Sequence, residues 1–248
     1  MAETKESEFV NANKKSPRIT AKICEYLTYS GREAFKRLRT NTLIALGEEG
    51  EKTCRVIGVT SSQPSEGKST VSINLAFSIA ELGKSVLLID GDMRRPSVHT
   101  TVGERRSPGL SEVLTGKENL KNAFVCYKSS TNETSFDMIL SGELPENPSE
   151  LLNSSRFKKF LEVISTAYEY VIIDLPPVNA VVDAVNVSKC IDGLIVVIRE
   201  NHCPRYVLDS CVQQLKYAKV NLLGFVMNGC VEGSGKHYQY NHYYQYGK

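Results

Sequence analysis

The stretch that decides the fold reads Ser61-Ser62-Gln63-Pro64-Ser65-Glu66-Gly67-Lys68-Ser69-Thr70. It follows a predicted strand at 56–59 and opens a predicted helix at 71–82, which is the context that a phosphate-binding P-loop requires. Backbone N–H groups of such a loop converge on phosphate oxygens, and the helix N-terminus adds a favourable dipole. The sequence therefore predicts nucleotide binding by the residues from Ser62 to Thr70, with Lys68 on the β- and γ-phosphates and Ser69 on Mg²⁺.

One position of this loop departs from the usual pattern. Ser62 stands where the motif ordinarily has its first glycine. A competing interpretation is a strand–helix turn that merely contains Gly-Lys-Ser and binds no nucleotide. The predicted strand on one side and the predicted helix on the other favour the P-loop.

Short apolar runs separated by helical patterns surround the loop. Further strands are predicted at 86–89, 136–140, 170–173, 194–198 and 222–227, and further helices at 31–46, 157–168 and 206–218. The strand runs are continuously apolar rather than alternating, as expected for parallel strands that helices cover on both faces. The predicted fold class is α/β, with a doubly wound, mostly parallel sheet of the P-loop NTPase type and a deviant Walker A loop.

Composition limits the class of protein. The chain has 248 residues, a net charge of +2, 41% hydrophobic residues and 23% charged residues, which suits one soluble α/β domain with short appendages. The charge is too close to neutral to argue for a nucleic-acid partner, and we expect none. No run of about 18 apolar residues exists to span a membrane. The seven cysteines include no C-x-x-C pair, so we expect reduced thiols, a cytoplasmic location and no metal other than magnesium.

The apolar pattern divides the chain into three parts. Residues 1–30 are predicted to form a flexible N-terminal arm, residues 31–231 the P-loop domain, and residues 232–248 a flexible tail. Near the end of the arm, Tyr26 and Tyr29 are expected to be buried by packing. The tail holds five of the chain's 12 tyrosines, Tyr238, Tyr240, Tyr243, Tyr244 and Tyr246. An adhesive or merely aromatic-rich peptide is the competing interpretation of the tail.

Three acidic residues lie just beyond predicted strands. Asp90 and Asp92 follow one strand, and Asp174 follows another, in the place of a Walker B aspartate. Ligands of open α/β sheets bind at the carboxyl ends of strands, so these side chains should lie near the P-loop. Magnesium takes oxygen ligands and often keeps waters, so one or two carboxylates suffice. Any single one of them could instead cap a turn, and Arg94 and Arg95 could bind phosphate or be solvated.

Together these motifs resemble the cytoplasmic bacterial tyrosine kinases, or BY-kinases, that control capsular and exopolysaccharide synthesis. The family's modified Walker A motif, in which serine is common at the Ser62 position, resembles residues 61–70. Its second acidic motif, Asp-x-Asp-x-Arg after an apolar strand, resembles residues 86–94, and its Walker B resembles residues 171–177. Residues 141–152 are also similar to the family. The resemblance covers residues 33–230 and the tyrosine tail.

The resemblance implies an ATP- and Mg²⁺-dependent kinase that phosphorylates the tail tyrosines of a neighbouring subunit. Lys68, Asp90 and Asp92 would be the catalytic residues, with Asp90 as the base for the tyrosine hydroxyl. Ser69, Asp92 and Asp174 would hold magnesium directly or through water.

The resemblance also implies partners. Glu33, Lys36 and Arg39 lie on a helix similar to the Glu-x-x-Arg-x-x-Arg helix of subunit contacts, although Lys36 replaces the first arginine. A homo-oligomer is therefore expected, with a ring as one arrangement. Gram-positive members are soluble, and the cytosolic tail of a separate membrane protein, a polysaccharide co-polymerase, activates them at the inner face of the membrane. A cognate tyrosine phosphatase is also expected.

Two other functions stay open. A partition or cell-division ATPase shares the fold and the three acidic positions, but usually has lysine where this loop has Gln63 and lacks a terminal tyrosine cluster. A nucleotide-gated regulatory module that transfers no phosphate would need the same binding residues. Asn228, at the end of the last predicted strand, would contact the nucleotide base, as in related P-loop ATPases, or cap the strand.

Overall fold

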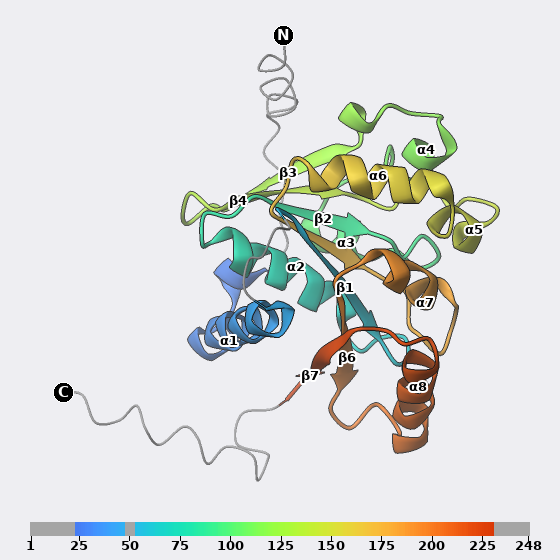
Figure 1. Ribbon diagram of the computed structural model, residues 1–248. Helices are drawn as coiled ribbons and strands as arrows, with labels where there is room; N and C mark the ends of the chain where they lie inside the picture. The colour runs from blue at the N-terminus through green and yellow to red at the C-terminus, as the bar shows by residue number, and fades with distance from the viewer. Residues whose placement is uncertain (1–22, 48–52, 231–248) are drawn as a thin grey trace.

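Residues 23–47 and 53–230 are described by the computed structural model, and they form a seven-stranded sheet with helices on both faces (Figure 1). Neighbouring strands are parallel except for β3 and β4. The doubly wound, mostly parallel sheet that the sequence predicts is therefore confirmed. The strand order is β3 (Phe124–Lys128), β4 (Ser135–Ile139), β2 (Val86–Asp90), β5 (Tyr170–Asp174), β1 (Arg55–Ser61), β6 (Gly193–Arg199) and β7 (Leu222–Asn228).

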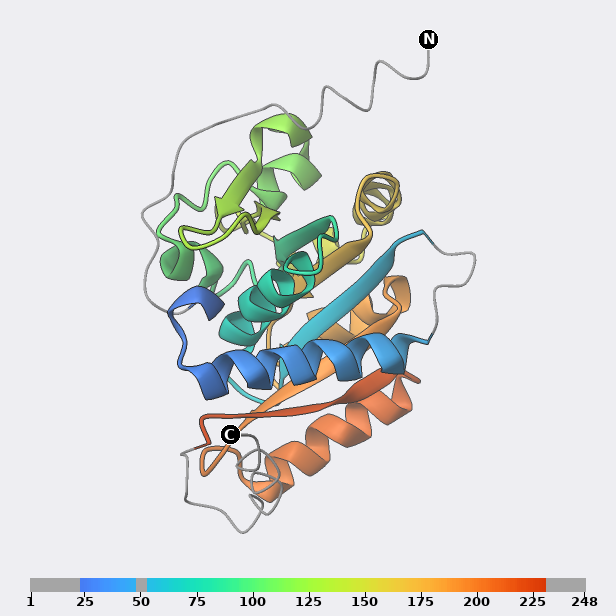
Figure 2. The same ribbon diagram turned by 90° about the vertical axis from the view of Figure 1, so that its left-hand side faces the viewer.

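The helices form two layers, one on each face of the sheet. Figure 2 shows the face on which α1 and α2 lie, with α1 outermost. That layer contains the 3₁₀ turn η1 (Cys24–Tyr26), α1 (Tyr29–Leu46), α2 (Lys68–Ala80) and α3 (Val98–Val102). The opposite layer contains α4 (Leu110–Thr115), α5 (Pro148–Leu152), α6 (Ser155–Ser165), α7 (Asp183–Val187) and α8 (Arg205–Tyr217), with the 3₁₀ turns η2 (Leu120–Asn122) and η3 (Ser188–Cys190) between them.

Each strand of the sheet centre supplies side chains to two hydrophobic cores. In β5, Val171 and Ile173 pack toward the layer of α6, whereas Tyr170 and Ile172 pack toward the layer of α2. Because side chains alternate between the faces of a sheet, burial of both faces requires an unbroken apolar run. This explains why the strands read as continuous apolar runs in the sequence.

The helices α2 and α6 differ in the pattern of their buried residues for the same reason. α2 lies between the sheet and α1, and every residue of it except Thr70 is buried. α6 is covered on one side only, so Phe157, Phe160, Leu161 and Ile164 are buried at helical spacing. Of these two helices, α6 alone shows an amphipathic pattern.

The N-terminal boundary differs from the predicted flexible arm of residues 1–30. Ile23 is fully buried in the core with α2, η1 follows it, and α1 already begins at Tyr29. The Glu25 carboxylate accepts a hydrogen bond from Ser130 N at 3.0 Å, which joins this segment to the β3–β4 connection. The expected burial of Tyr26 and Tyr29 is wrong, because these side chains are 47% and 74% exposed.

The sheet register brings the predicted site residues to one edge. Asp90 and Asp174 are direct partners in the pairing of β2 with β5, and Val59 pairs with Asp174 in the pairing of β1 with β5. The three strands are parallel, so their carboxyl ends meet where the chain leaves β1 at Ser61 for the P-loop. This is the edge at which open α/β sheets bind ligands.

Candidate active site

The P-loop turns from β1 into α2 with two residues in the left-handed region. Ser65 has a φ of 67° and Gly67 has a φ of 91°. Left-handed residues alternating with right-handed ones allow successive backbone N–H groups to form an anion-binding nest. A Cβ on Gly67 would lie 2.0 Å from Asn228 Nδ2. The left-handed backbone therefore favours glycine at this position, and a Cβ would also displace the Asn228 amide.

Glu66 shapes the outer half of the loop. Its side chain is fully buried, and its Oε2 accepts hydrogen bonds from the backbone N–H groups of Ser62 and Gln63, at 2.8 and 3.0 Å. The Ser62 hydroxyl donates to the same oxygen at 2.9 Å. The serine that replaces the usual first glycine thus satisfies a buried carboxylate. Ser62 and Glu66 maintain the loop conformation and do not line the cavity described below.

Two further side-chain hydrogen bonds connect the loop to neighbouring segments. Gln63 Nε2 donates to the His202 carbonyl oxygen at 2.8 Å, and Asn228 Nδ2 donates to the Glu66 carbonyl oxygen at 2.9 Å. Asn228 lies at the end of β7, as the sequence predicts, and holds the P-loop there. Its contact with a nucleotide base stays a prediction.

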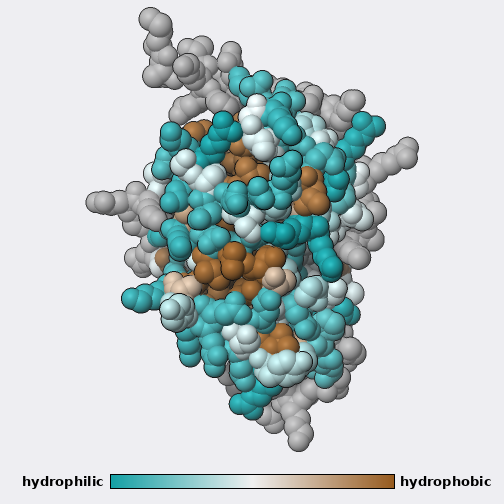
Figure 3. Space-filling model, turned by 90° about the vertical axis from the view of Figure 1, so that its right-hand side faces the viewer, coloured by the Kyte–Doolittle hydropathy of each residue, from teal (hydrophilic) through white to brown (hydrophobic). Residues whose placement is uncertain are grey.

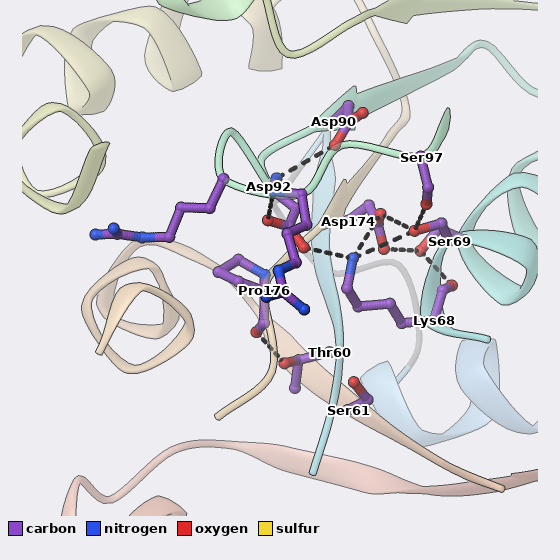
Figure 4. Close-up of polar contacts among 12 residues, drawn as sticks. Thr60, Ser61, Lys68, Ser69, Asp90, Asp92, Ser97, Asp174 and Pro176 are labelled. Carbon is purple, nitrogen blue, oxygen red and sulfur yellow. Dashed lines mark hydrogen bonds and ion pairs between the residues drawn. The ribbon is translucent and has the colours of Figure 1, made fainter. Parts of the chain in front are cut away.

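Lys68, the first residue of α2, lies among acidic side chains (Figure 4). Its Nζ is 2.9 Å from Asp92 Oδ2 and 3.2 Å from Asp174 Oδ2. Burial opposes the charged ammonium, but the charges of Asp174 and Asp92 outweigh this effect and raise the pKa of Lys68 above its ordinary value. Lys68 therefore stays cationic beside two carboxylates.

The oxygens predicted to hold magnesium converge on one point. Ser69 Oγ, Asp92 Oδ2 and Asp174 Oδ2 all lie within 3.2 Å of Lys68 Nζ. Ser72 donates to Asp174 Oδ1 at 2.9 Å, and Ser97 donates to Ser69 Oγ at 2.7 Å, so a second set of hydrogen bonds orients these oxygens. Hard oxygen donors, two of them anionic, match the coordination chemistry of Mg²⁺, so the residues present fit the ion.

Asp90 lies behind this group. It is fully buried, its Oδ1 accepts a hydrogen bond from Asp92 N at 3.2 Å, and its Oδ2 has no partner among the residues that the structure describes. Burial, together with the nearby charge of Asp174, raises the pKa of Asp90 well above its ordinary value. Asp92 lines the cavity and Asp90 does not, which disagrees with the predicted role of Asp90 as the base for an incoming hydroxyl.

A cavity of about 480 Å³ opens beside Lys68 and has lining residues of two kinds. The charged and polar part comes from the P-loop, Asp92, Arg94, Arg95 and Ser97. The apolar part comes from the segment after β5 and consists of Pro176, Pro177, Ala180 and Val181. A cavity of this size with a few convergent polar groups is typical of a small-molecule site.

The predicted site residues separate into two groups. Six of the nine predicted P-loop residues line the cavity, whereas Ser62, Gln63 and Glu66 shape the loop. Ser72 and Ser97, which donate hydrogen bonds to the side-chain oxygens of Asp174 and Ser69, could not be predicted from the sequence, because only the tertiary structure brings them there. The apolar lining was not predicted either, although Pro176-Pro177 follows the Walker B aspartate closely in the sequence.

Arg94 and Arg95, whose roles the sequence left open, have different surroundings. Arg94 Nη2 donates to Ser149 Oγ at 2.9 Å, and its Nε lies 3.4 Å from Asp183 Oδ2. The backbone N–H of Arg95 donates to Asp92 Oδ1 at 3.0 Å. Arg94 is thus tied to two other segments, and Arg95 belongs to the turn that carries Asp92.

The three predicted subunit-contact residues of α1 are not equivalent. Lys36 forms an ion pair of 2.7 Å with Glu33 on the same helix, and both are partly exposed. Arg39 is turned inward, where its guanidinium donates to the Ser78 carbonyl oxygen of α2 at 2.5 Å. Arg39 therefore helps to dock α1 on α2 within one subunit. This contact was not expected from its predicted role in subunit contacts.

Two other expectations concern parts of the chain beyond this site. The predicted phosphoacceptors Tyr238, Tyr240, Tyr243, Tyr244 and Tyr246 lie outside the described residues. None of the helices in the described ranges has the length and apolar character needed to cross a membrane.

The comparisons with known proteins agree with the geometry of the site. Residues 54–221 match a family model described as an AAA domain. The chain is 36% identical to tyrosine-protein kinase YwqD of Bacillus subtilis (strain 168) over 211 residues, which is 85% of each protein. It is 32% identical to tyrosine-protein kinase CpsD of Streptococcus agalactiae over 212 residues, 85% of this chain and 89% of that protein. The solved kinase domain of Escherichia coli tyrosine kinase ETK matches with a TM-score of 0.73 at 34% identity, over 84% of this chain and 79% of that one.

Proposed function

The chain belongs to the family of bacterial tyrosine-protein kinases and is a protein-tyrosine kinase, and we propose that it phosphorylates its own C-terminal tyrosines on a neighbouring copy. The observation that carries the proposal is the convergence of Lys68, Asp92 and Asp174 beside the P-loop. Phosphoryl transfer depends mainly on positioning and charge neutralisation, which this group supplies. Relatives named tyrosine-protein kinases, at 32% and 36% identity, favour this function over a partition-type ATPase or a regulatory module.

The proposed cofactors are ATP and Mg²⁺. The backbone N–H groups of the P-loop would bind the phosphates, Ser69 and Asp174 would hold the metal, and Asp92 would help to hold it through water. Bound magnesium would neutralise charge on the β- and γ-phosphate oxygens. A divalent cation among these oxygens repels an ammonium group, so Lys68 would turn from the two carboxylates to the phosphates.

Asp92 is the better candidate to receive the hydroxyl proton. In the transfer step the tyrosine oxygen bonds to the γ-phosphorus while the bond to the β–γ bridging oxygen breaks, and ADP leaves. The proton passes to the Asp92 carboxylate, which lines the cavity. Asp90 is buried, and its raised pKa favours the neutral acid. We therefore assign Asp90 to holding the backbone of Asp92, through the hydrogen bond to Asp92 N.

The apolar part of the cavity suits the ring of an acceptor tyrosine. Pro177, Ala180 and Val181 line the same cavity as Lys68 and Asp92. A phenol has a flat apolar body and one polar end, so it fits a site with an apolar lining beside charged groups. Figure 3 shows a hydrophobic patch near the centre of the face that carries α5, α7 and α8, and Val182, next to this lining, is 60% exposed.

The remaining parts of the proposal follow from the family resemblance. The kinase would regulate capsular or exopolysaccharide synthesis as a homo-oligomer, activated at the membrane by the cytosolic tail of a polysaccharide co-polymerase and reversed by a tyrosine phosphatase. Each phosphate adds about −1.5 to −2 charges. Several phosphates on residues 238–246 would make the tail anionic and favour disassembly.

Phosphosite mapping tests the proposed function. The purified protein is incubated with ATP and Mg²⁺, with and without a peptide of the activator's cytosolic tail, and analysed by mass spectrometry. Phosphotyrosine within residues 238–246 that is lost with EDTA is the expected result. ATP hydrolysis without phosphotyrosine would favour a switch ATPase, and the absence of both activities would favour the regulatory module.

A further inference from the structure

We infer that Asp183 is a positioning residue for phosphoryl transfer, which acts through Arg94 and Ser149 on the turn that presents Asp92 to Lys68. Asp183 lies at the start of α7 and is 1% exposed. It does not line the cavity. The inference rests on the proposed role of Asp92 at the reacting centre.

Both oxygens of the Asp183 carboxylate are engaged by other segments. Oδ2 lies 3.4 Å from Arg94 Nε, and Oδ1 accepts a hydrogen bond from the Ser149 hydroxyl. The same hydroxyl oxygen accepts a hydrogen bond from Arg94 Nη2 at 2.9 Å. The three side chains therefore form a closed network between the turn after β2, α5 and α7.

The network reaches the reacting centre along one short turn. Asp92 Oδ1 accepts the N–H of Arg95 at 3.0 Å, and Asp92 Oδ2 lies 2.9 Å from Lys68 Nζ. Arg94 lies inside this turn, directly before Arg95. Because the network holds the Arg94 side chain, it restricts the conformation of the turn. The turn sets the direction in which Asp92 presents Oδ2 to Lys68.

The same network also anchors the apolar part of the cavity. Asp183 comes directly after the segment that supplies Pro176, Pro177, Ala180 and Val181. Arg94 belongs to the segment that supplies Asp92, Arg95 and Ser97. One buried carboxylate thus joins the two segments between which the reacting groups must meet, and proximity effects make transfer sensitive to their spacing.

The chemistry of the contacts explains why arginine is needed. Arg94 uses Nε for Asp183 and Nη2 for Ser149, so the contact requires the planar fork of a guanidinium. A lysine would keep the charge but could not make both contacts in this geometry. This ion pair contributes little net stability, because Arg94 is 40% exposed to screening solvent and desolvation of the buried Asp183 offsets the attraction. Its effect is therefore expected mainly in the positions of the joined segments.

Hydrogen–deuterium exchange of the full-length protein tests the coupling independently of kinase activity. Asp183→Asn and Arg94→Lys are compared with the wild type and with Arg106→Gln, which removes an exposed ion pair with Glu143. Exchange in the peptide covering residues 91–97 should rise at least about threefold in both network variants and stay unchanged in the control, since local opening governs exchange. Unchanged exchange in 91–97 for a folded Asp183→Asn protein would overturn the inference.

Steady-state kinetics give the second test. Both network variants should lower kcat for tyrosine phosphorylation about tenfold, and Asp183→Asn, whose side chain does not line the cavity, should keep the affinity for ADP within about twofold of the wild type. The Asp183→Asn and Arg94→Lys double variant should lose no more than the worse single variant, since the residues act as one unit. Additive losses would contradict the network.

A wild type without phosphotyrosine would instead refute the proposed function, while the exchange experiment still decides the network. If Asp183→Asn does not fold, Arg94→Lys, whose side chain is 40% exposed, carries both tests.

Discussion

Asp90 and Asp174 are direct partners in the parallel pairing of β2 with β5, so two fully buried carboxylates lie side by side at the edge of the sheet. Asp174 shares its Oδ2 with Lys68 and its Oδ1 with Ser72. Asp90 has only one oxygen engaged within the described part of the chain, by the backbone of Asp92. The two acids therefore differ in role although the sequence places them alike, and their difference leads to the first prediction.

Asp90→Asn should stabilise the protein increasingly as pH rises. Burial and the charge of Asp174 raise the pKa of Asp90 above the ordinary 3.8. Folding therefore favours the protonated acid, so the wild type loses stability relative to the variant as pH rises from 3.8 through the raised pKa. The melting temperatures of both proteins, measured by calorimetry from pH 5 to pH 8, give the comparison. A difference that shrinks with rising pH would contradict the assignment.

Gly67→Ala should lose nucleotide affinity by more than about tenfold. The substitution has a backbone cost of about 1–2 kcal/mol at positive φ, and its Cβ would lie 2.0 Å from Asn228 Nδ2. Gly83→Ala is the matched control, because Gly83 also has a positive φ but no atom within 4 Å of its Cβ. Titration with a fluorescent ADP analogue should show normal affinity for the control. A Gly67→Ala protein that binds the analogue as tightly as the Gly83→Ala control would contradict the prediction.

Glu66→Gln should weaken nucleotide binding even though the Glu66 side chain does not line the cavity. The neutral amide oxygen would accept these three hydrogen bonds more weakly than the carboxylate, since hydrogen bonds to charged groups contribute about 1.5–3 kcal/mol and neutral ones about 0.5–1.5 kcal/mol. Glu169→Gln is the control, since Glu169 also accepts a backbone N–H, from Ser85, but is partly exposed. Calorimetric titration with Mg-ADP and chemical denaturation measure both effects. If the Glu66→Gln protein is less stable but binds Mg-ADP with wild-type affinity, the prediction is wrong, and Glu66 stabilises the loop without affecting nucleotide binding.

Val181→Asp should raise the KM for a tyrosine peptide about tenfold while the affinity for nucleotide stays within about twofold. A carboxylate on the apolar lining is unfavourable for a phenol ring and lies near the acidic centre. Val163→Asp, on the 52% exposed valine of α6, is the control that adds the same charge elsewhere. Initial rates over a range of peptide concentrations provide the measurement. A loss confined to ATP affinity would place the nucleotide, rather than the acceptor, on this lining.

The sequence predicts the central part of the fold because its signals are strong there. The continuous apolar runs of β1, β2, β5 and β6 are readable since both faces of these strands are buried. The strand β3 was not predicted, because it is a half-buried antiparallel edge strand whose sequence is not a continuous apolar run. The five- and six-residue helices α3, α4, α5 and α7 are too short to show a helical period.

Residues of the site could be predicted from the sequence only where they belong to a recognisable motif. Lys68, Ser69, Asp92 and Asp174 come from motifs at strand ends, and the parallel register brings them together. Contacts between distant segments, such as Ser149 with Asp183, leave no pattern in a single sequence. The division of roles between Asp90 and Asp92 also required the fold, because burial distinguishes the two acids and their spacing does not.

The central claim is that the Lys68 site of one copy phosphorylates the tail of another. The most direct test mixes two full-length proteins, Lys68→Met with an intact tail and a second chain with phenylalanine at Tyr238, Tyr240, Tyr243, Tyr244 and Tyr246. Loss of the lysine should reduce activity by about 10²–10³, since it removes a preorganised charge at the transferred group. Mass spectrometry should therefore find no appreciable phosphotyrosine on either protein alone, and phosphotyrosine on the Lys68→Met tail after mixing with ATP and Mg²⁺. A Lys68→Met tail that stays unmodified beside a partner with demonstrated kinase activity toward a tyrosine peptide would contradict the account.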